Sequence, residues 1–286
     1  MSDRWKIALL LSPAILVIVI LFLGGMGFGF AQSLNYMPII GLDSPNFDAY
    51  VSVLTSKSFY LSAFLTAYIS LVSTLLSCII AIGAALILRR SFVGRPFANF
   101  LFQVNLTIPH LVGAIGILYL FSQSGFFARL AHEFHLISQP GEFPAMIYDP
   151  LAIGIILQYV WKEVPFIGII VLANMQSFGD DYETVGRSLG ANRWQTFRYV
   201  LLPMIFPGLL SAAMIVFAFT FGAYEIPALL GQNHPAALPV LAYQKFKEVD
   251  LGAARPEAMA LAMIIAFLSG VLILGYAWAA RRRIRS

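Results

Sequence analysis

A few ionisable side chains lie inside long apolar stretches of this chain, and they are the first candidates for chemistry. Lys162 and Glu163 interrupt one such stretch. A charge at the centre of a membrane span costs at least about 2.5–3.5 kcal/mol, so such residues usually face a bundle interior or water. Two interpretations stay open: a structural ion pair with neighbours, or a lining of a solute path. Adjacent helix residues do not face each other, so the two are poor partners for one another.

A third carboxylate, Glu225, precedes Pro227 in another apolar stretch. It offers a negative charge to a cationic solute or a gate, or else lies at the membrane interface. We expect Pro227 to break the helix just beyond it and to leave carbonyls that need partners. Tyr224 either stacks on a solute or belongs to an aromatic belt. The candidate solute path therefore consists of Lys162, Glu163, Tyr224 and Glu225.

Catalytic and metal chemistry find less support in the sequence. His132 and His135 have a spacing seen in metal sites, but no further ligand lies near them, so we expect no metal. His110 follows Pro109, which favours a helix kink over the catalytic histidine of an intramembrane enzyme. Cys78 lies in an apolar run and is expected to be a small core residue. We expect no catalytic residues.

The elements that carry these residues belong to a membrane protein. The chain has 286 residues, of which 59% are apolar and 11% are charged. Soluble domains carry about 25% charged residues, and the basic residues here form no patch with interleaved aromatics, which argues against nucleic-acid binding. A helix of about 20 apolar residues crosses a bilayer. We expect one all-helical domain over 1–286, with spans near 7–30, 59–88, 100–122, 151–173, 205–230 and 259–280.

Basic residues predict the orientation of these spans. The N-terminal segment, the second and fourth connections and the tail hold most of the 18 lysines and arginines. The positive-inside rule therefore places both termini and the connection 177–203 in the cytoplasm. The first apolar run is longer than the roughly 7–15 residues of a signal-peptide core, so we expect it to be a retained span.

The connection 177–203 has the pattern of two short helices with a bend between them. An apolar stripe at i, i+3 and i+7 marks the first helix, and Gly190 is placed to end it. Pro203 is expected to end the second helix or to turn the chain into the next span. The first stripe contains Tyr182, Val185 and Leu189, and the second helix has a face with Trp194, Phe197, Val200 and Leu201. Such a segment either rests on the inner leaflet with its arginines at lipid phosphates or docks a cytoplasmic partner.

This connection resembles the cytoplasmic loop signature of permease subunits of bacterial binding-protein-dependent ABC importers. The signature reads Glu-Ala-Ala, three residues, Gly, nine residues, then Ile-x-Leu-Pro. Gly190 matches the glycine, and Val200, Leu202 and Pro203 fall at the last three positions. Thr184-Val185-Gly186 stands where the signature has Glu-Ala-Ala, with Glu183 one place early.

Two further stretches extend the resemblance from about Tyr50 to the C-terminus. Trp161–Phe178 looks like the span that precedes this loop in the family. Phe217–Gly231 looks like the span that follows it in the branch that includes spermidine and putrescine permeases. The resemblance implies a type I importer permease in the bacterial inner membrane, with about six transmembrane helices and both termini cytoplasmic. Its solute would be polyamine-like or another small polar molecule.

The resemblance also implies the partners of the chain. These are two copies of an ABC ATPase that use ATP-Mg, a second permease in a homo- or heterodimer, and a periplasmic or extracellular solute-binding protein. No Gly-Lys dipeptide occurs, so this chain lacks a phosphate-binding loop and we expect it to bind no cofactor. Gly190 would set the bend of the coupling loop, and Arg187 and Arg193 would meet polar ATPase groups. The implied coupling residues are Asp181, Tyr182, Glu183, Thr184, Val185, Gly186, Arg187, Leu189, Gly190, Ala191, Arg193, Trp194, Leu202 and Pro203.

One alternative remains, a self-contained secondary transporter. That class often shows inverted repeats with interrupted helices at matching places. Pro165 interrupts the fourth span, and no counterpart repeats its surroundings. The pattern therefore favours a permease that depends on a separate ATPase.

Overall fold

The computed structural model describes residues 3–90, 92–178 and 181–284. These residues are helical or irregular, apart from an isolated bridge between Met37 and Leu42. The described chain divides into two compact units. Unit 1 contains Met1–Leu61 and Leu238–Leu268, and unit 2 contains Ser62–Ala237 and Ser269–Ser286.

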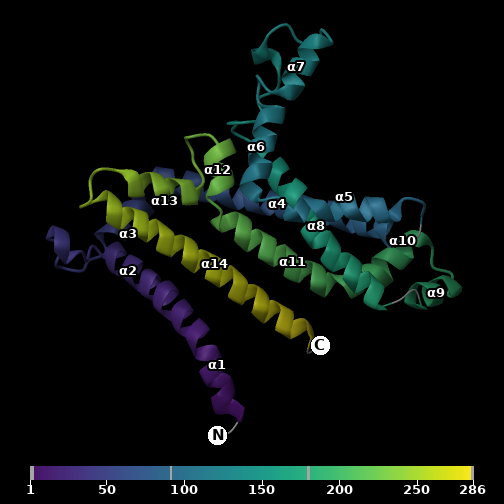
Figure 1. Ribbon diagram of the computed structural model, residues 1–286, viewed down its shortest axis with the longest axis horizontal. Helices are drawn as coiled ribbons and strands as arrows, with labels where there is room; N and C mark the ends of the chain where they lie inside the picture. Colours follow the sequence, from purple (N-terminus) through teal and green to yellow (C-terminus); the bar gives the residue numbers. More distant parts are fainter. Residues whose placement is uncertain (1–2, 91, 179–180, 285–286) are drawn as a thin grey trace. The chain divides into compact units, whose positions relative to one another are not determined.

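Unit 1 is built from two segments that are far apart in the sequence, one N-terminal and one near the C-terminus (Figure 1). Its helices and helical turns are α1 (Asp3–Ile18), η1 (Val19–Leu23), α2 (Gly24–Ser33), η2 (Pro38–Ile40), α3 (Asp48–Thr55), α13 (Leu238–Lys247) and the first half of α14 (Ala254–Ile284), whose second half belongs to unit 2.

Unit 2 holds the residues that the sequence singled out. Its helices and helical turns are most of α4 (Lys57–Leu88), then α5 (Arg95–Thr107), α6 (His110–Phe121), α7 (Phe126–Glu133), η3 (Pro140–Glu142), α8 (Ile153–Phe178), α9 (Asp181–Ser188), α10 (Arg193–Thr196), η4 (Phe197–Leu201), α11 (Leu202–Gly222) and α12 (Glu225–Leu230).

Six helical segments of the described chain are long and apolar enough to cross a membrane, which confirms the predicted fold class. Each overlaps one of the six predicted spans, although the bounds differ. The segments are Leu9–Ser33, Lys57–Leu88, His110–Glu133, Ile153–Phe178, Arg193–Gly222 and Ala254–Gly275.

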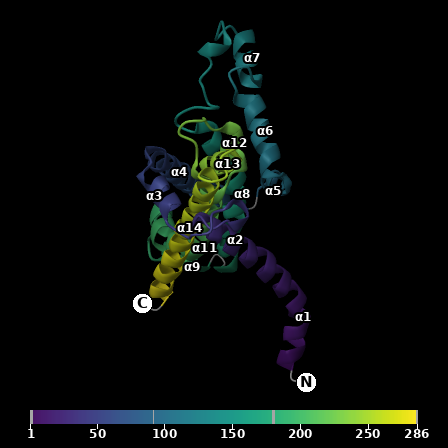
Figure 2. The ribbon, with the colours of Figure 1, turned by 90° about the vertical axis from the view of Figure 1, so that its left-hand side faces the viewer.

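Helix α8 is the central helix of unit 2. In its apolar window 56% of the residues are buried, the largest share among the six segments. One end of α8 packs in a cluster with α4, α6 and α12 around Tyr159 and Ile155. The other end packs with α4 and α11 around Ile167 and Ile205. Helices α8 and α11 lie side by side in this unit (Figures 1 and 2). The buried side chains of α8 therefore pack against neighbouring helices on several sides.

The predicted third span, 100–122, is broken in the structure. Helix α5 ends at Thr107, Ile108 and Pro109 have extended ψ angles of 125° and 143°, and α6 begins at His110. Proline lacks a backbone N–H and disfavours the helical region for the residue before it, so the chain leaves the helix here. The break leaves the last carbonyls of α5 without helical partners.

The predicted fifth span, 205–230, is also interrupted, but the expected place of the break was wrong. Helix α11 ends at Gly222, Ala223 is extended, and Glu225 opens the short helix α12. Pro227 lies in the first turn of α12, where a missing N–H costs no intrahelical bond. The break therefore precedes Glu225, and its carboxylate lies at the N-terminal turn of α12.

A polar network holds three elements of unit 1 together. Lys245 of α13 lies 3.1 Å from Glu257 of α14 and 3.3 Å from Glu248, and Ser52 of α3 donates a hydrogen bond to Glu257. Burial lowers the pKa of Lys245, but the two carboxylates more than offset this, and the pKa lies above its ordinary value. Lys245 is therefore charged at neutral pH and keeps this network intact.

Candidate functional site

The connection between α8 and α11 contains the two short helical pieces that the sequence predicts. Helix α9 ends at Ser188, and Gly190 follows in the left-handed region with φ +87°. The Gly190 N–H donates to the Arg187 carbonyl, and the Ala191 N–H donates to the Gly186 carbonyl. These two bonds define a Schellman motif with glycine at its left-handed position. A residue with a Cβ would cost about 1–2 kcal/mol at Gly190, so the bend depends on this glycine.

The second piece begins with a cap that the sequence reading missed. The Asn192 side chain accepts from the Gln195 N–H, and the Gln195 side chain accepts from the Asn192 N–H. Asparagine followed three residues later by glutamine is a recognisable signal for such a capping box. With a Schellman motif on one side and a capping box on the other, the bend has a defined geometry.

Of the two outcomes that the sequence left open for Pro203, the structure has the second: Pro203 does not end the second piece, and the chain continues through it into the fifth span. The helical segment runs without interruption from Arg193 to Gly222, and the π-helical turn η4 (Phe197–Leu201) lies directly before Pro203. Pro203 falls in the first turn of α11. The wider turn before it accommodates a residue without a backbone N–H. The loop is therefore joined to the fifth span by continuous helix, and motion of one end is transmitted to the other.

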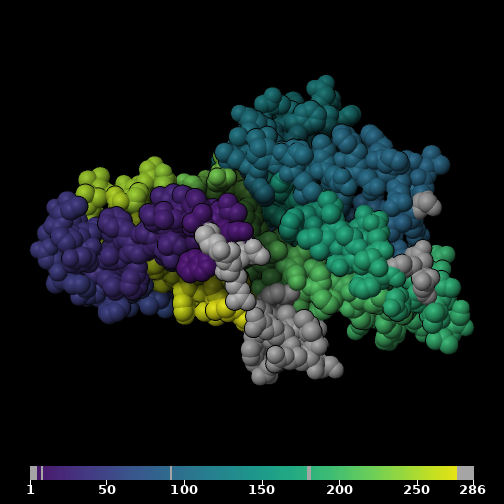
Figure 3. All heavy atoms as spheres, turned by 60° about the horizontal axis from the view of Figure 1, so that its bottom comes forward, coloured from purple at the N-terminus to yellow at the C-terminus, as the bar shows by residue number. Residues whose placement is uncertain are grey.

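Helix α9 presents its predicted apolar stripe outward. Leu189 is 84% exposed, and Tyr182, Val185 and Trp194 are also exposed. We call these four residues the apolar tip. Figure 3 shows this green stretch of chain at the surface of unit 2. Large apolar side chains that are exposed on an ordered loop are typical of a surface that binds a partner. The side chain of Asp181, also expected to act in the loop, lies outside the described part of the structure.

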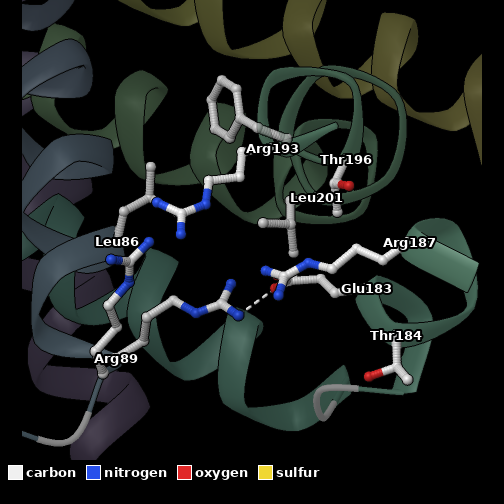
Figure 4. A pocket seen from close by; sticks show the side chains of 10 residues that line it. Leu86, Arg89, Glu183, Thr184, Arg187, Arg193, Thr196 and Leu201 are labelled. Atoms are coloured by element: carbon white, nitrogen blue, oxygen red, sulfur yellow. Dashed lines mark hydrogen bonds and ion pairs between the residues drawn. The ribbon is translucent and has the colours of Figure 1, made fainter. Parts of the chain in front are cut away.

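A different side of α9 carries Glu183, which is buried although it lies in a loop. Glu183 forms ion pairs with Arg89 at the end of α4 and with Arg187 one turn further along α9, the latter at 3.4 Å (Figure 4). The carboxylate one place before the signature position therefore ties the loop to the second span. Thr184 and Arg193 line the same pocket. Arg187 and Arg193 line this pocket and are also exposed, so their expected contact with polar ATPase groups stays a prediction.

Lys162 binds the α5 side of the break between α5 and α6. Its side chain is 4% exposed. Its Nζ donates to the Asn105 carbonyl at 2.6 Å and to the Ile108 carbonyl. In return, the Asn105 side chain donates to the Trp161 carbonyl of α8. The ammonium group therefore satisfies the carbonyls that the Pro109 break frees, which is a structural role.

Two further residues that form hydrogen bonds near this break, Gln158 and Asn105, were not predicted from the sequence. Gln158 donates from Nε2 to the His110 carbonyl at 3.0 Å, and Asn105 anchors α5 to α8. Neutral amides in apolar helices are common enough that nothing marked these two residues. Together with Lys162 they join both sides of the break to α8.

Tyr224 and Glu225 line a hollow of about 680 Å³ in unit 2. His110, Phe219 and Ala223 are also on its wall. The His110 Nε2 lies 3.3 Å from the Glu163 Oε1, and the ring centroids of His110 and Phe219 are 4.8 Å apart. Glu163 therefore stands behind His110 and next to the hollow. Of the four predicted path residues, the structure brings three to this place and separates Lys162.

No group of three or more histidine, cysteine, aspartate or glutamate side chains that could hold a metal ion occurs among the described residues. The His132 and His135 pair belongs to this part of the chain.

The family of the chain follows from its residues 77–284, which match the family model of binding-protein-dependent transport system inner membrane components. The chain belongs to this family. It is a multi-pass inner-membrane permease of the ABC importer type, and transport rather than catalysis is its family's activity. The matched region includes the loop, the break at Pro109 and the hollow at Glu225.

Two curated relatives show how far the permease resembles known proteins. A probable sulfate transport system permease of Marchantia polymorpha is 26% identical over 214 residues, which cover 73% of this chain and 69% of the relative. A probable ABC transporter permease of Sinorhizobium fredii is 28% identical over 230 residues, which cover 78% and 73%. The similarity spans most of both chains.

A solved structure shares the fold of the permease. A chain of a bacterial ABC transporter that imports the acidic polysaccharide alginate superposes with a TM-score of 0.81 at 21% identity, and the match covers 98% of this chain and 96% of that one. At this identity the likeness concerns the fold alone. It agrees with the predicted importer permease architecture over almost the whole length.

Proposed function

We propose that this permease forms half of the solute pathway of an ATP-driven importer and that its α9–α10 loop couples the pathway to a separate ATPase subunit. The supporting observation is the apolar tip, which lies exposed on a loop of fixed geometry. The ATPase subunits would bind ATP-Mg, a second permease would complete the pathway, and a binding protein would deliver the solute from outside. The positive-inside rule supports a cytoplasmic position for the loop.

The loop is mechanically suited to this task. It is tied to α4 by Glu183 and continues into α11 through unbroken helix. A push on the apolar tip therefore reaches two spans that pack with the central helix α8. Small shifts at such a contact are transmitted because packed helices move as rigid bodies.

Leu189→Glu tests this proposal at the most exposed residue of the apolar tip. A buried apolar contact in an interface contributes about 2 kcal/mol or more, and tenfold in affinity corresponds to about 1.4 kcal/mol. We expect the purified variant to bind its ATPase subunit at least about thirtyfold more weakly, measured by titration of one subunit with the other. ATP-dependent uptake should fall in parallel.

Val249→Glu is the matched control, since Val249 is 96% exposed and follows α13 in unit 1. It should leave ATPase binding unchanged. If Leu189→Glu binds the ATPase as tightly as the wild type, the loop does not dock there. If uptake proceeds without any ATPase subunit, the chain is instead a self-contained secondary transporter.

For the solute we infer a cation, polyamine-like or another small amine. The supporting observation is the charge at the hollow, where Glu225 lines the wall and Glu163 stands behind His110. Tyr224 and Phe219 add aromatic faces that attract cations. The relatives include a permease named for sulfate, so an anion is the competing class. The Glu225 carboxylate at the wall repels an anion, which favours the cation.

Glu225→Gln tests the inferred charge of the solute. A charge-assisted hydrogen bond contributes about 1.5–3 kcal/mol, so we expect uptake of labelled spermidine at low concentration to fall about tenfold or more. Glu133→Gln, on α7 outside the hollow, should leave uptake unchanged. The readout is initial uptake by proteoliposomes that contain the full transporter with its binding protein. Uptake of sulfate by the wild type, with no uptake of amines, would contradict the inference.

A further inference from the structure

A pocket of about 510 Å³ between the end of α4 and the loop is rich in arginine. Arg89 and Arg90 come from α4's end, Arg187 from α9 and Arg193 from α10. We call it the arginine pocket. Figure 4 shows labelled guanidinium groups of different elements directed toward the same space. Its size falls within the range of pockets that hold small ligands.

The described side chains that line the arginine pocket carry an excess of positive charge. They include four arginines and one carboxylate, that of Glu183. Glu183 is already shared between Arg89 and Arg187. Among the described residues, Arg90 and Arg193 form no ion pair. Guanidinium groups on separate elements that face one space form a recurrent arrangement for binding phosphate, because each can donate two parallel hydrogen bonds.

Apart from Thr184 and Thr196, the remaining wall of the pocket is apolar, and its apolar residues lie near the ends of two candidate spans. Leu86 stands in the last turn of the second candidate span, and Phe197 and Leu201 stand near the start of the fifth. Because the pocket lies at the ends of two candidate spans, we expect it to be near the depth of lipid headgroups. Basic residues at this depth attract anionic lipids. A ligand with a phosphate and an adjoining apolar part would contact both kinds of wall.

We propose that the arginine pocket binds the phosphate group of an anionic ligand, and that its apolar wall suits an anionic phospholipid. A soluble phosphate compound shares the same phosphate chemistry. The site is distinct from the apolar tip, because none of the four residues of the tip lines the pocket. The inference does not depend on the proposed coupling function, because the pocket is formed by this chain alone.

The test measures two ligands on the purified full-length chain in a neutral detergent. One arm titrates radiolabelled phosphatidylglycerol in mixed micelles, with phosphatidylcholine as the competitor. The other arm titrates radiolabelled inorganic phosphate by equilibrium dialysis. We expect Arg193→Gln and Arg90→Gln each to weaken binding of phosphatidylglycerol at least about tenfold, since each removes a charge-assisted donor.

Arg198→Gln is the matched control, because Arg198 lies in the same helical segment but contacts the Tyr199 ring and does not line the pocket. It should change affinity less than about twofold. Binding of inorganic phosphate with the same dependence on Arg90 and Arg193, without lipid binding, would support the phosphate site and identify a soluble source.

Equal losses in Arg198→Gln and Arg193→Gln would overturn the proposal, because they would show attraction to general surface charge. The proposal would also be overturned if the wild-type chain bound neither phosphatidylglycerol nor inorganic phosphate. This outcome does not depend on whether any variant folds. Thermal unfolding of each variant separates a lost site from a lost structure.

Discussion

Lys162→Met is expected to lower the free energy of unfolding by about 3–5 kcal/mol. The buried ammonium donates to the carbonyls of Asn105 and Ile108 at the broken end of α5. Each hydrogen bond to a charged group contributes about 1.5–3 kcal/mol. The Asn105 carbonyl would keep its bond from the Ile108 N–H, whereas the Ile108 carbonyl would lose its bond to Lys162 and carry its desolvation cost. Methionine keeps the length and volume of the side chain, so the loss isolates the two bonds. Denaturant unfolding of the full chain in detergent measures it.

Lys57→Met is the matched control, since Lys57 is exposed at the start of α4. Its cost should stay within about 0.5 kcal/mol, as for most surface changes. The same pair separates the two readings of Lys162 that the sequence left open. If Lys162→Met unfolds like the wild type but transports poorly, the ammonium serves the solute path and the structural account is wrong.

Lys162 shows which part of the site the sequence could predict and which part it could not. A lysine in an apolar helix is conspicuous, and its burial was predictable from the cost of a charge in lipid. Its partners are backbone carbonyls more than fifty positions away, at a break created by Pro109. No residue type signals a free carbonyl. The six helices and the bend at Gly190 were predictable because hydropathy and a left-handed glycine act locally.

The faces of the loop show the same limit. Helical spacing predicts that Tyr182, Val185 and Leu189 share a side, and they do. It also places Glu183 and Arg187 together, four residues apart. It cannot predict that Arg89 approaches from another span and makes Glu183 a buried link. It also gives no sign that Arg187 and Arg193 line a pocket of the chain itself, and their contact with a partner stays a prediction.

Glu183→Arg is expected to be about as costly as the loss of Lys162, at about 3–5 kcal/mol. Breaking a buried ion pair leaves an uncompensated charge, and the side chains of Glu183 and Arg89 are 10% and 16% exposed. The substitution also places a third guanidinium beside Arg89 and Arg187. The loop should detach from α4, so that ATP hydrolysis by the assembled transporter no longer responds to solute. Unfolding in denaturant and solute-stimulated ATPase activity are the two measurements.

A charge exchange distinguishes this link from a general defect. Glu183→Arg combined with Arg89→Glu restores one attractive pair, and a double-mutant cycle should show coupling of about 1 kcal/mol or more between the two positions. Glu142→Arg, at an exposed carboxylate in η3, should leave both measurements near the wild type. Additive losses in the double variant would mean that the pair does not join the loop to the second span. Recovery of stability without recovery of coupling would instead limit the link to a structural role, because the loop would be attached and yet unable to transmit motion.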